Sequence, residues 1–566
     1  MKKYHLFLIV IAVLSLNSCE KFLDVKTQGF QDVSNFFNTD RDAIRAISAC
    51  YYELPQESLI GRDIYWEQGC CNDFVWGRTR DFNTLATLHY TGQEKPLLDA
   101  FGQIYARAMN RCNWVIQGLT NRSKERTLSA IETRSLGEAL FLRAYYHFLI
   151  AYRYGTRELG VPFVAYETFE GGYNNQIPPQ SESVMKDYEL IIEDLTKAES
   201  LLPRFEEYGV DDRGRAHKAA AVALMSKVYA YWAGWDPTQW TKVIECVNKL
   251  DAQTPGSVYD RDLHPSFSEL FTADATKFWT KEYCFSFPSY GGKNNNGGGS
   301  IEFPGVCLEN KGWSGELPAG LGYNGWGQFK PTEEIYQEMA KDNVTPGVKN
   351  ERLAKSILEY GDAFTYFGQP FLFHSSSDIE AGFQINKYME AFIPEDASGN
   401  TALDNEDWPC TRINWPIIRF ADCLLLRAEA NLVAGNGAAA AQDINRIRLR
   451  SNLKPLTGVA TWTDLYHERR CELAFELAAD HAYDCKRWAV FGDPEIQALA
   501  LKELNTHPQV RHHANRADPM SSYTVGDYQD YMIPEKVWNP RCLTFPYPSS
   551  QIAKSNGLLQ NPPSWQ

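Results

Sequence analysis

The sequence predicts a mainly α-helical fold: a tetratricopeptide-like helical-repeat scaffold with long irregular loops, in a single large domain. Apolar residues recur at helical spacing in two regions of the chain. The periodic segments are each about 15 to 20 residues long and are joined by short turns, which is typical of stacked helix pairs. The repeat assignment depends on these lengths alone, because the chain has no clean self-match of about 34 residues.

The first helical region contains three predicted helices. Ser129 and Glu132 form a capping box at the start of the first helix, which ends at Gly155. The second helix covers residues 181–203 and ends at a proline. The third covers residues 216–235, where many alanines suit close contact between helices.

The second helical region lies nearer the C-terminus. An apolar stripe runs from Ile418 to Leu432 and stops at Gly435, and another helix begins at Ala438. A further helix follows Thr463, and its many glutamates and arginines predict a charged face with pairs four residues apart.

The N-terminus has the pattern of a lipoprotein signal peptide. Two lysines precede an uncharged apolar run from Leu6 to Leu16, which is followed by Cys19. The run is too short to cross a bilayer, which takes about 20 apolar residues. We therefore expect residues 1–18 to be removed and Cys19 to carry the lipid that anchors the protein. The alternative is a cleaved signal with a chance cysteine at its end.

Composition indicates a folded chain that does not bind nucleic acid. Hydrophobic residues make up 44% and aromatic residues 13%, enough for a large core. The formal charge of -15 would repel phosphates. The cysteines after Cys19 lack metal-type spacing, so we expect mostly buried free thiols, with a redox pair at Cys70 and Cys71 as the alternative.

The chain changes character between the helical regions. From about residue 283 to residue 329 it is rich in glycine, asparagine and aromatic residues and has no helical period. A long irregular segment in a compact protein is either functional or disordered, and its aromatic content favours an ordered surface. Residues 65–82 form a shorter stretch of similar character.

Several blocks of the chain resemble the SusD/RagB family of outer-membrane nutrient-binding lipoproteins. The most specific match is WPIIRFADCLLLRAEANLVAGN followed by INRIRLRS. In chain order the blocks are residues 137–164, 194–203, 214–235, 415–451, 468–488 and 545–565. They span essentially the whole mature chain, although Pro563 and Ser564 stand where the family usually has a glycine. The resemblance implies a helical N-terminal region over residues 19–280, an irregular binding segment over 281–410 and a C-terminal region over 411–566.

The resemblance also implies a function. Family members bind glycan, or peptide in some cases, at the cell surface and act as a lid on a SusC-like TonB-dependent outer-membrane transporter. We therefore expect an oligosaccharide ligand, such a transporter as partner, and an outer-membrane location through the lipid anchor. The polar and bulky residues of the matching helices are expected to serve ion pairing and packing. They are Arg143, Arg419, Glu429, Arg469, Glu476, Asp484, Arg487 and Trp488.

The candidate site residues follow from the chemistry of sugars, which offer flat C–H faces and a rim of hydroxyl groups. Aromatic rings stack on the faces, and planar polar groups bind the hydroxyls. The candidate rings are Trp76, Tyr290, Trp313, Tyr323 and Trp326, and the candidate polar partners are Asn72, Asp73, Arg78 and Asn294. The alternative for each ring is that it packs within its own loop.

The sequence favours binding without catalysis. A glycoside hydrolase would need two carboxylates about 5 to 9 Å apart, and no acidic pair lies in a recognisable motif. A nucleophile elbow, a phosphate loop and an HExxH motif are absent from the sequence. His507, His512 and His513 form a local cluster that an exposed loop explains better than a metal site, so no cofactor is expected. A helical scaffold that binds only proteins is the third hypothesis.

Overall fold

The computed structural model describes most of the chain. The described residues are 36–61, 63–75, 79–169, 179–272, 274–288, 329–359, 362, 365–366, 369–370, 382–388, 413–476, 481–515, 521–529 and 535–566. None of the helices in these ranges is both long enough and apolar enough to span a membrane.

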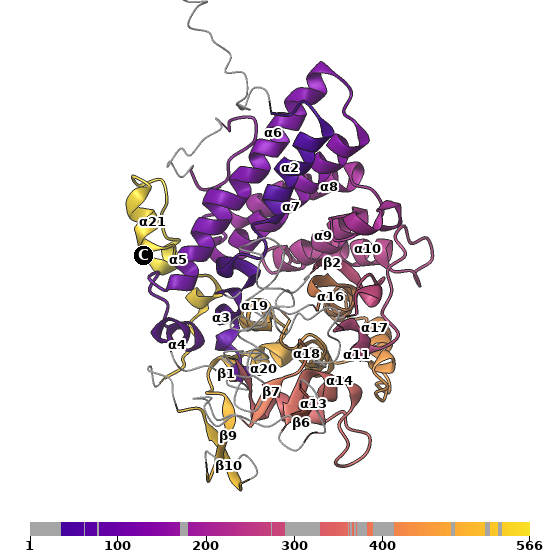
Figure 1. Cartoon of the computed structure of the whole chain (residues 1–566). Helices are drawn as coiled ribbons and strands as arrows, with labels where there is room; N and C mark the ends of the chain where they lie inside the picture. Colours follow the sequence, from indigo (N-terminus) through magenta and orange to yellow (C-terminus); the bar gives the residue numbers. More distant parts are fainter. Residues whose placement is uncertain are drawn as a thin grey trace, which may run out of the picture.

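Helices dominate the described part of the chain (Figure 1). In the N-terminal half they are α2 (Asp40–Tyr51), α3 (Asp63–Glu67), α4 (Arg80–Ala86), α5 (Lys95–Phe101), α6 (Asn110–Glu125), α7 (Ala130–Tyr154), α8 (Val184–Leu201), α9 (Lys218–Trp232), α10 (Trp240–Leu250) and α11 (Phe267–Leu270). In the C-terminal half they are α13 (Glu333–Ala340), α14 (Glu351–Ser356), α16 (Phe420–Val433), α17 (Gly437–Arg450), α18 (Trp462–Glu472), α19 (His481–Phe491), α20 (Pro494–Leu504) and α21 (Ser549–Lys554).

The strands described form five antiparallel two-stranded ribbons. They pair β1 (Phe74–Val75) with β3 (Lys330–Pro331), β2 (Tyr283–Phe287) with β8 (Trp415–Arg419), β4 (Ile357–Glu359) with β7 (Phe383–Ile385), β5 (Thr365–Tyr366) with β6 (Gln369–Pro370), and β9 (Gln509–His513) with β10 (Tyr523–Asp527).

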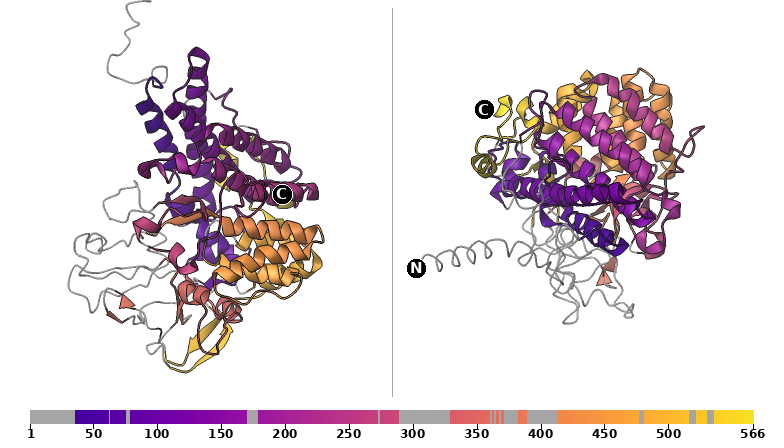
Figure 2. Two further views of the ribbon diagram at one scale, coloured as in Figure 1. Left: turned by 90° about the vertical axis from the view of Figure 1, so that its right-hand side faces the viewer. Right: turned by 90° about the horizontal axis from the view of Figure 1, so that it is seen from above.

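Consecutive helices pack side by side, as the predicted helical scaffold requires. Helix α7 packs against α6 and α8, and α9 packs against α8 and α10. Helix α16 packs against α10 and also against α17 and α18, which extends the stack (Figure 2). The C-terminal segment closes the molecule on its N-terminal half, since the Phe545 backbone N–H donates to the Arg153 carbonyl at 2.7 Å. The apolar residues make one connected core, which confirms the mainly helical single domain.

Helix ends match the sequence signals in most places. Ser129 and Glu132 form the predicted capping box of α7. Gly435 adopts a φ of 73°, a conformation that glycine adopts without strain, and it ends α16. The apolar stripe was predicted to be helical from Ile418, but Ile418 lies in strand β8 and the helix begins at Phe420. A short apolar run does not distinguish a buried strand from a helix.

The charged residues of the core helices are paired, as predicted for the family motif residues. Arg143 of α7 makes two hydrogen bonds of 2.7 Å with Asp194 of α8. Both terminal nitrogens of Arg487 donate to Glu429 at 2.6 Å, and the Trp488 indole N–H donates to the same carboxylate at 2.8 Å. Loss of either partner would leave an uncompensated buried charge, at a cost of about 3 to 5 kcal/mol.

Two predictions about polar residues were wrong. The charged residues of α18 were predicted to pair four residues apart along one face, but Glu468 and Glu472 are buried and pair with arginines of other helices. His512 and His513 do not lie in a loop, since both belong to strand β9. The cysteines that the structure describes are free thiols and nearly all are buried, as expected.

Candidate functional site

Ribbon β1–β3 joins the two segments that carry the candidate rings. Val75 pairs with Lys330, and Phe74 pairs with Pro331. Trp76 follows Val75 directly in the chain, and the segment 289–328 ends just before Phe329 and Lys330. Because the strands are antiparallel, both candidate segments leave the ribbon at the same end.

Ribbon β2–β8 holds the other end of the long irregular segment. Phe287 at the end of β2 pairs with Trp415 at the start of β8. Residues 289–328 therefore begin beside the point where the chain returns from residues 389–412. The two ribbons fix four chain ends that are far apart in sequence.

A buried aromatic cluster supports both ribbons. The Phe329 ring centroid lies 5.0 Å from that of Phe74 and 5.8 Å from that of Tyr65. Tyr65 in turn contacts Trp415 at 5.7 Å, and Trp415 stacks on Tyr388 at 4.1 Å. These rings are in the core, so much of the stretch 65–82 is interior and does not form the surface that its composition suggested. The cluster gives the candidate segments a rigid base.

Asn72 and Asp73 lie immediately before β1 and are almost fully buried. The Asn72 amide oxygen accepts a hydrogen bond of 2.8 Å from Lys536, and its side-chain nitrogen donates to Thr506 at 3.1 Å. Asp73 accepts a hydrogen bond of 2.7 Å from Arg470. These bonds fix the start of the ribbon, and direct contact of Asn72 or Asp73 with a sugar stays a prediction.

Lys330 of β3 is buried beside the neighbouring ribbon, and its pKa is lowered. Its ammonium group is buried and donates to Gln384 of β7 at 2.5 Å. Burial disfavours the charged form and lowers the pKa of Lys330 to about 7. The hydrogen bond ties the ribbon to the neighbouring β4–β7 ribbon.

The remaining candidates lie outside the described residues. These are Trp76, Arg78, Tyr290, Asn294, Trp313, Tyr323, Trp326 and the lipidation candidate Cys19. Sequence reasoning missed the supporting cluster of Tyr65, Phe329 and Trp415. The only sequence feature that could have indicated this cluster is that apolar residues flank both irregular segments.

Comparison with known proteins assigns this helical scaffold to a class of proteins. A family model described as the SusD family matches residues 281–565, and a second, described as starch-binding associating with outer membrane, matches residues 21–230. The first match covers half of the chain. The protein therefore belongs to the SusD family. The description of the second model points to carbohydrate binding at the outer membrane.

Similar proteins match nearly the whole length of the chain. SusD-like protein P25 of Formosa agariphila is 22% identical over 93% of this chain and 97% of its own length. A SusD-like protein of Bacteroides ovatus is 23% identical and covers 100% of this chain and 98% of its own. Neither these relatives nor the family models carry the name of an enzymatic activity.

Solved structures confirm the fold. A SusD-like protein from Bacteroides fragilis superimposes with a TM-score of 0.70 at 21% identity, over 94% of this chain and 98% of its own. A SusD-like carbohydrate-binding protein from the same species gives 0.69 at 19% identity, over 93% of this chain and 100% of its own. A structure described with xylogluco-oligosaccharide gives 0.68 at 18% identity, over 92% and 98%.

Proposed function

We propose that this protein is a non-catalytic glycan-binding lipoprotein of the cell surface. It captures oligosaccharides and delivers them to a SusC-like TonB-dependent transporter in the outer membrane, where Cys19 anchors it. The observation that carries the proposal is that, in a chain of the SusD family, the segments with Trp76 and with Trp313 and Trp326 are attached to one ribbon.

The chemistry of the candidate rings supports a weak and reversible site. A Trp or Tyr ring that covers one sugar face buries about 80 Å² of contact and contributes about 2 kcal/mol. Two or three such rings, less the entropy lost on association, give dissociation constants of about micromolar to millimolar. Affinity in this range suits capture followed by release to a transporter.

Titration calorimetry against oligosaccharides and peptides tests the proposal. Oligosaccharide binding without hydrolysis products in chromatography supports capture. Peptide binding alone would favour a RagB-like peptide carrier. Product formation would favour a surface glycoside hydrolase, and absence of all binding would favour a protein-binding scaffold.

Variants Trp313→Ala and Trp326→Ala assign the site. We expect each to weaken oligosaccharide binding about tenfold, since most of one ring contact is lost. The thermal midpoint should stay unchanged if the rings face the ligand. Tyr52→Ala is the control, because Tyr52 is an exposed aromatic residue at the end of α2. If both tryptophan variants unfold early, the rings belong to the core and this assignment fails.

A further inference from the structure

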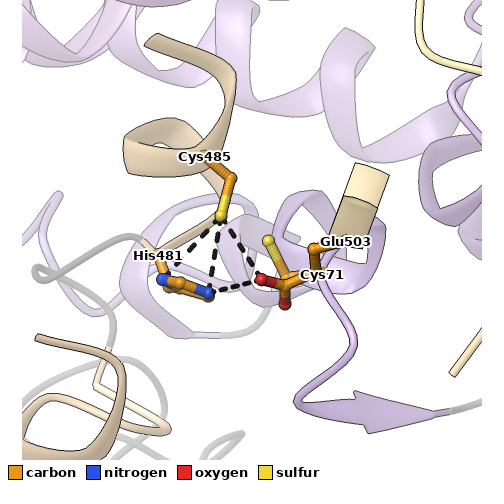
Figure 3. A group of neighbouring side chains, drawn as sticks. All are labelled: Cys71, His481, Cys485 and Glu503. Carbon is orange, nitrogen blue, oxygen red and sulfur yellow. Dashed lines mark hydrogen bonds and ion pairs between the residues drawn. The ribbon is translucent and has the colours of Figure 1, made fainter. Parts of the chain in front are cut away.

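A group of metal-ligating side chains lies close to ribbon β1–β3. Cys71 follows directly after a 3-10 helix that ends at Cys70, His481 and Cys485 are one turn apart on α19, and Glu503 is in the last turn of α20 (Figure 3). One ligand atom from each residue lies within 4.8 Å of every other. Residues four apart on a helix share a face, so α19 presents its imidazole and thiol together.

The distances between these atoms are close to those around a tetrahedral metal ion. Cys485 Sγ lies 3.5 Å from His481 Nε2 and 3.5 Å from Glu503 Oε2, and His481 Nε2 lies 3.0 Å from Glu503 Oε2. The Cys71 sulfur lies within 4.8 Å of one ligand atom of each of the other three residues. Zinc bonds of about 2.0 to 2.3 Å place neighbouring tetrahedral ligands about 3.3 to 3.8 Å apart. Small movements of the side chains would bring the four ligand atoms to these distances.

One side chain must turn for the ion to bind. Cys485 Sγ is 3.5 Å from Nε2 of His481 and 4.0 Å from Nδ1, so the sulfur lies over the imidazole face. A metal ion binds to an imidazole nitrogen in the plane of the ring. The ring of His481 must therefore rotate until this plane points to the space between its nitrogen and the Cys485 sulfur. The side chain of His481 is 11% exposed while Glu503 is 4% exposed, so the histidine side gives the ion its route from solvent.

The surroundings fix the carboxylate and balance charge. Glu503 Oε1 accepts a hydrogen bond of 2.8 Å from the Asn72 backbone N–H and lies 3.3 Å from Arg470 Nη2, while the Tyr466 hydroxyl donates to Oε2. Lys536 Nζ lies 2.7 Å from the Glu503 carbonyl oxygen. Two thiolates, a carboxylate and a divalent ion leave one negative charge, and the neighbouring Arg470 and Lys536 offset it.

We propose that Cys71, His481, Cys485 and Glu503 form a structural zinc site. Two sulfurs and an imidazole select zinc over calcium or magnesium, which prefer all-oxygen ligands. The four ligands close the coordination sphere, so the ion has a structural role. It joins the chain just before β1 to α19 and α20, and so braces the ribbon that carries the candidate segments.

Metal content of the full-length protein in detergent tests the site. The protein is kept reduced with a phosphine, incubated with zinc chloride, freed of excess metal and measured by mass spectrometry of the element. We expect one zinc per chain and, with cobalt in place of zinc, the absorption bands of thiolate-bound tetrahedral cobalt. His481→Gln and Glu503→Gln should each weaken zinc binding at least about tenfold.

A control variant tests whether zinc binding depends on these four residues or on any buried thiol. Cys284→Ser removes a buried thiol beside Cys423, in another part of the core, and should leave zinc binding unchanged. Cys485→Ser should abolish binding, and the two glutamine variants keep the test valid if this variant does not fold. Wild-type protein without bound zinc would overturn the proposal. So would zinc binding that survives His481→Gln, or a disulfide between Cys71 and Cys485 in native protein.

Discussion

At the scale of single residues, His467 shows how buried charge is organised in this fold. Its ring lies 2.6 Å from a carboxylate oxygen of Glu338 and 3.0 Å from one of Asp342. Burial alone would lower the pKa of His467, but the neighbouring Cys471 sulfur and the two carboxylates outweigh it and raise the pKa to about 12. The pKa of Glu338 falls to about 2 despite burial, since His467 and Lys341 favour its charged form.

These shifts predict how stability depends on pH. The folded pKa of His467 is above its ordinary value near 6.5, so its contribution is complete below about pH 6.5 and is lost as pH rises toward 12. The contribution of Glu338 to the free energy of unfolding is complete above about pH 4.5 and is lost as pH falls toward 2. His467→Gln should therefore lower the free energy of unfolding by about 3 kcal/mol at pH 6 and by less at pH 9.

Urea unfolding of both proteins at several pH values measures this difference. The two stability curves should converge between pH 6 and pH 9. A difference that is the same at both pH values would show that folding does not raise the pKa of His467. His89→Gln is the matched control, since the His89 ring bonds only to Thr87 close by in the chain among the contacts described.

At the scale of elements, capping and periodicity predicted the long helices because these signals are local. The capping box of α7 and the end of α16 at Gly435 are set by residues within one turn. Strand β8 could not be found in this way, since its partner β2 lies more than a hundred residues earlier. The buried charges of α18 escaped prediction for the same reason, because Glu468 pairs with Arg352, which is distant in the chain.

Ser129 provides a test at this scale. Its hydroxyl oxygen accepts a hydrogen bond of 3.1 Å from the Glu132 backbone N–H and also donates to Asp40 at the start of α2. Ser129→Ala should therefore lower the free energy of unfolding by about 1 to 2 kcal/mol. Ser123→Ala is the control, since this exposed hydroxyl within α6 donates only to a backbone carbonyl among the contacts described. Circular dichroism during urea unfolding would measure both, and equal stability of the two variants would contradict a role for the cap.

At the scale of the whole molecule, the sequence predicted the fold class and the family more fully than the binding site. Helical blocks in a fixed order identify the scaffold, whereas the site depends on which distant segments meet. The pairing of Val75 with Lys330 brings together segments that are separated by about half of the chain. A local sequence pattern cannot predict this pairing. The irregular segments have no repeating pattern, so composition could suggest their role but could not place any single ring.

The proposed attachment to the membrane concerns the whole molecule. We propose that the lipid on Cys19 anchors the protein. Residues 20–35 separate this cysteine from the described fold and can span at most roughly 55 Å. Cys19→Ala should move the protein from the membrane fraction to the soluble fraction, measured by ultracentrifugation and immunoblotting. Ser18→Ala is the control and should stay bound, because it keeps a small residue before the cysteine. Full retention of Cys19→Ala in membranes washed with high salt would contradict a lipid anchor.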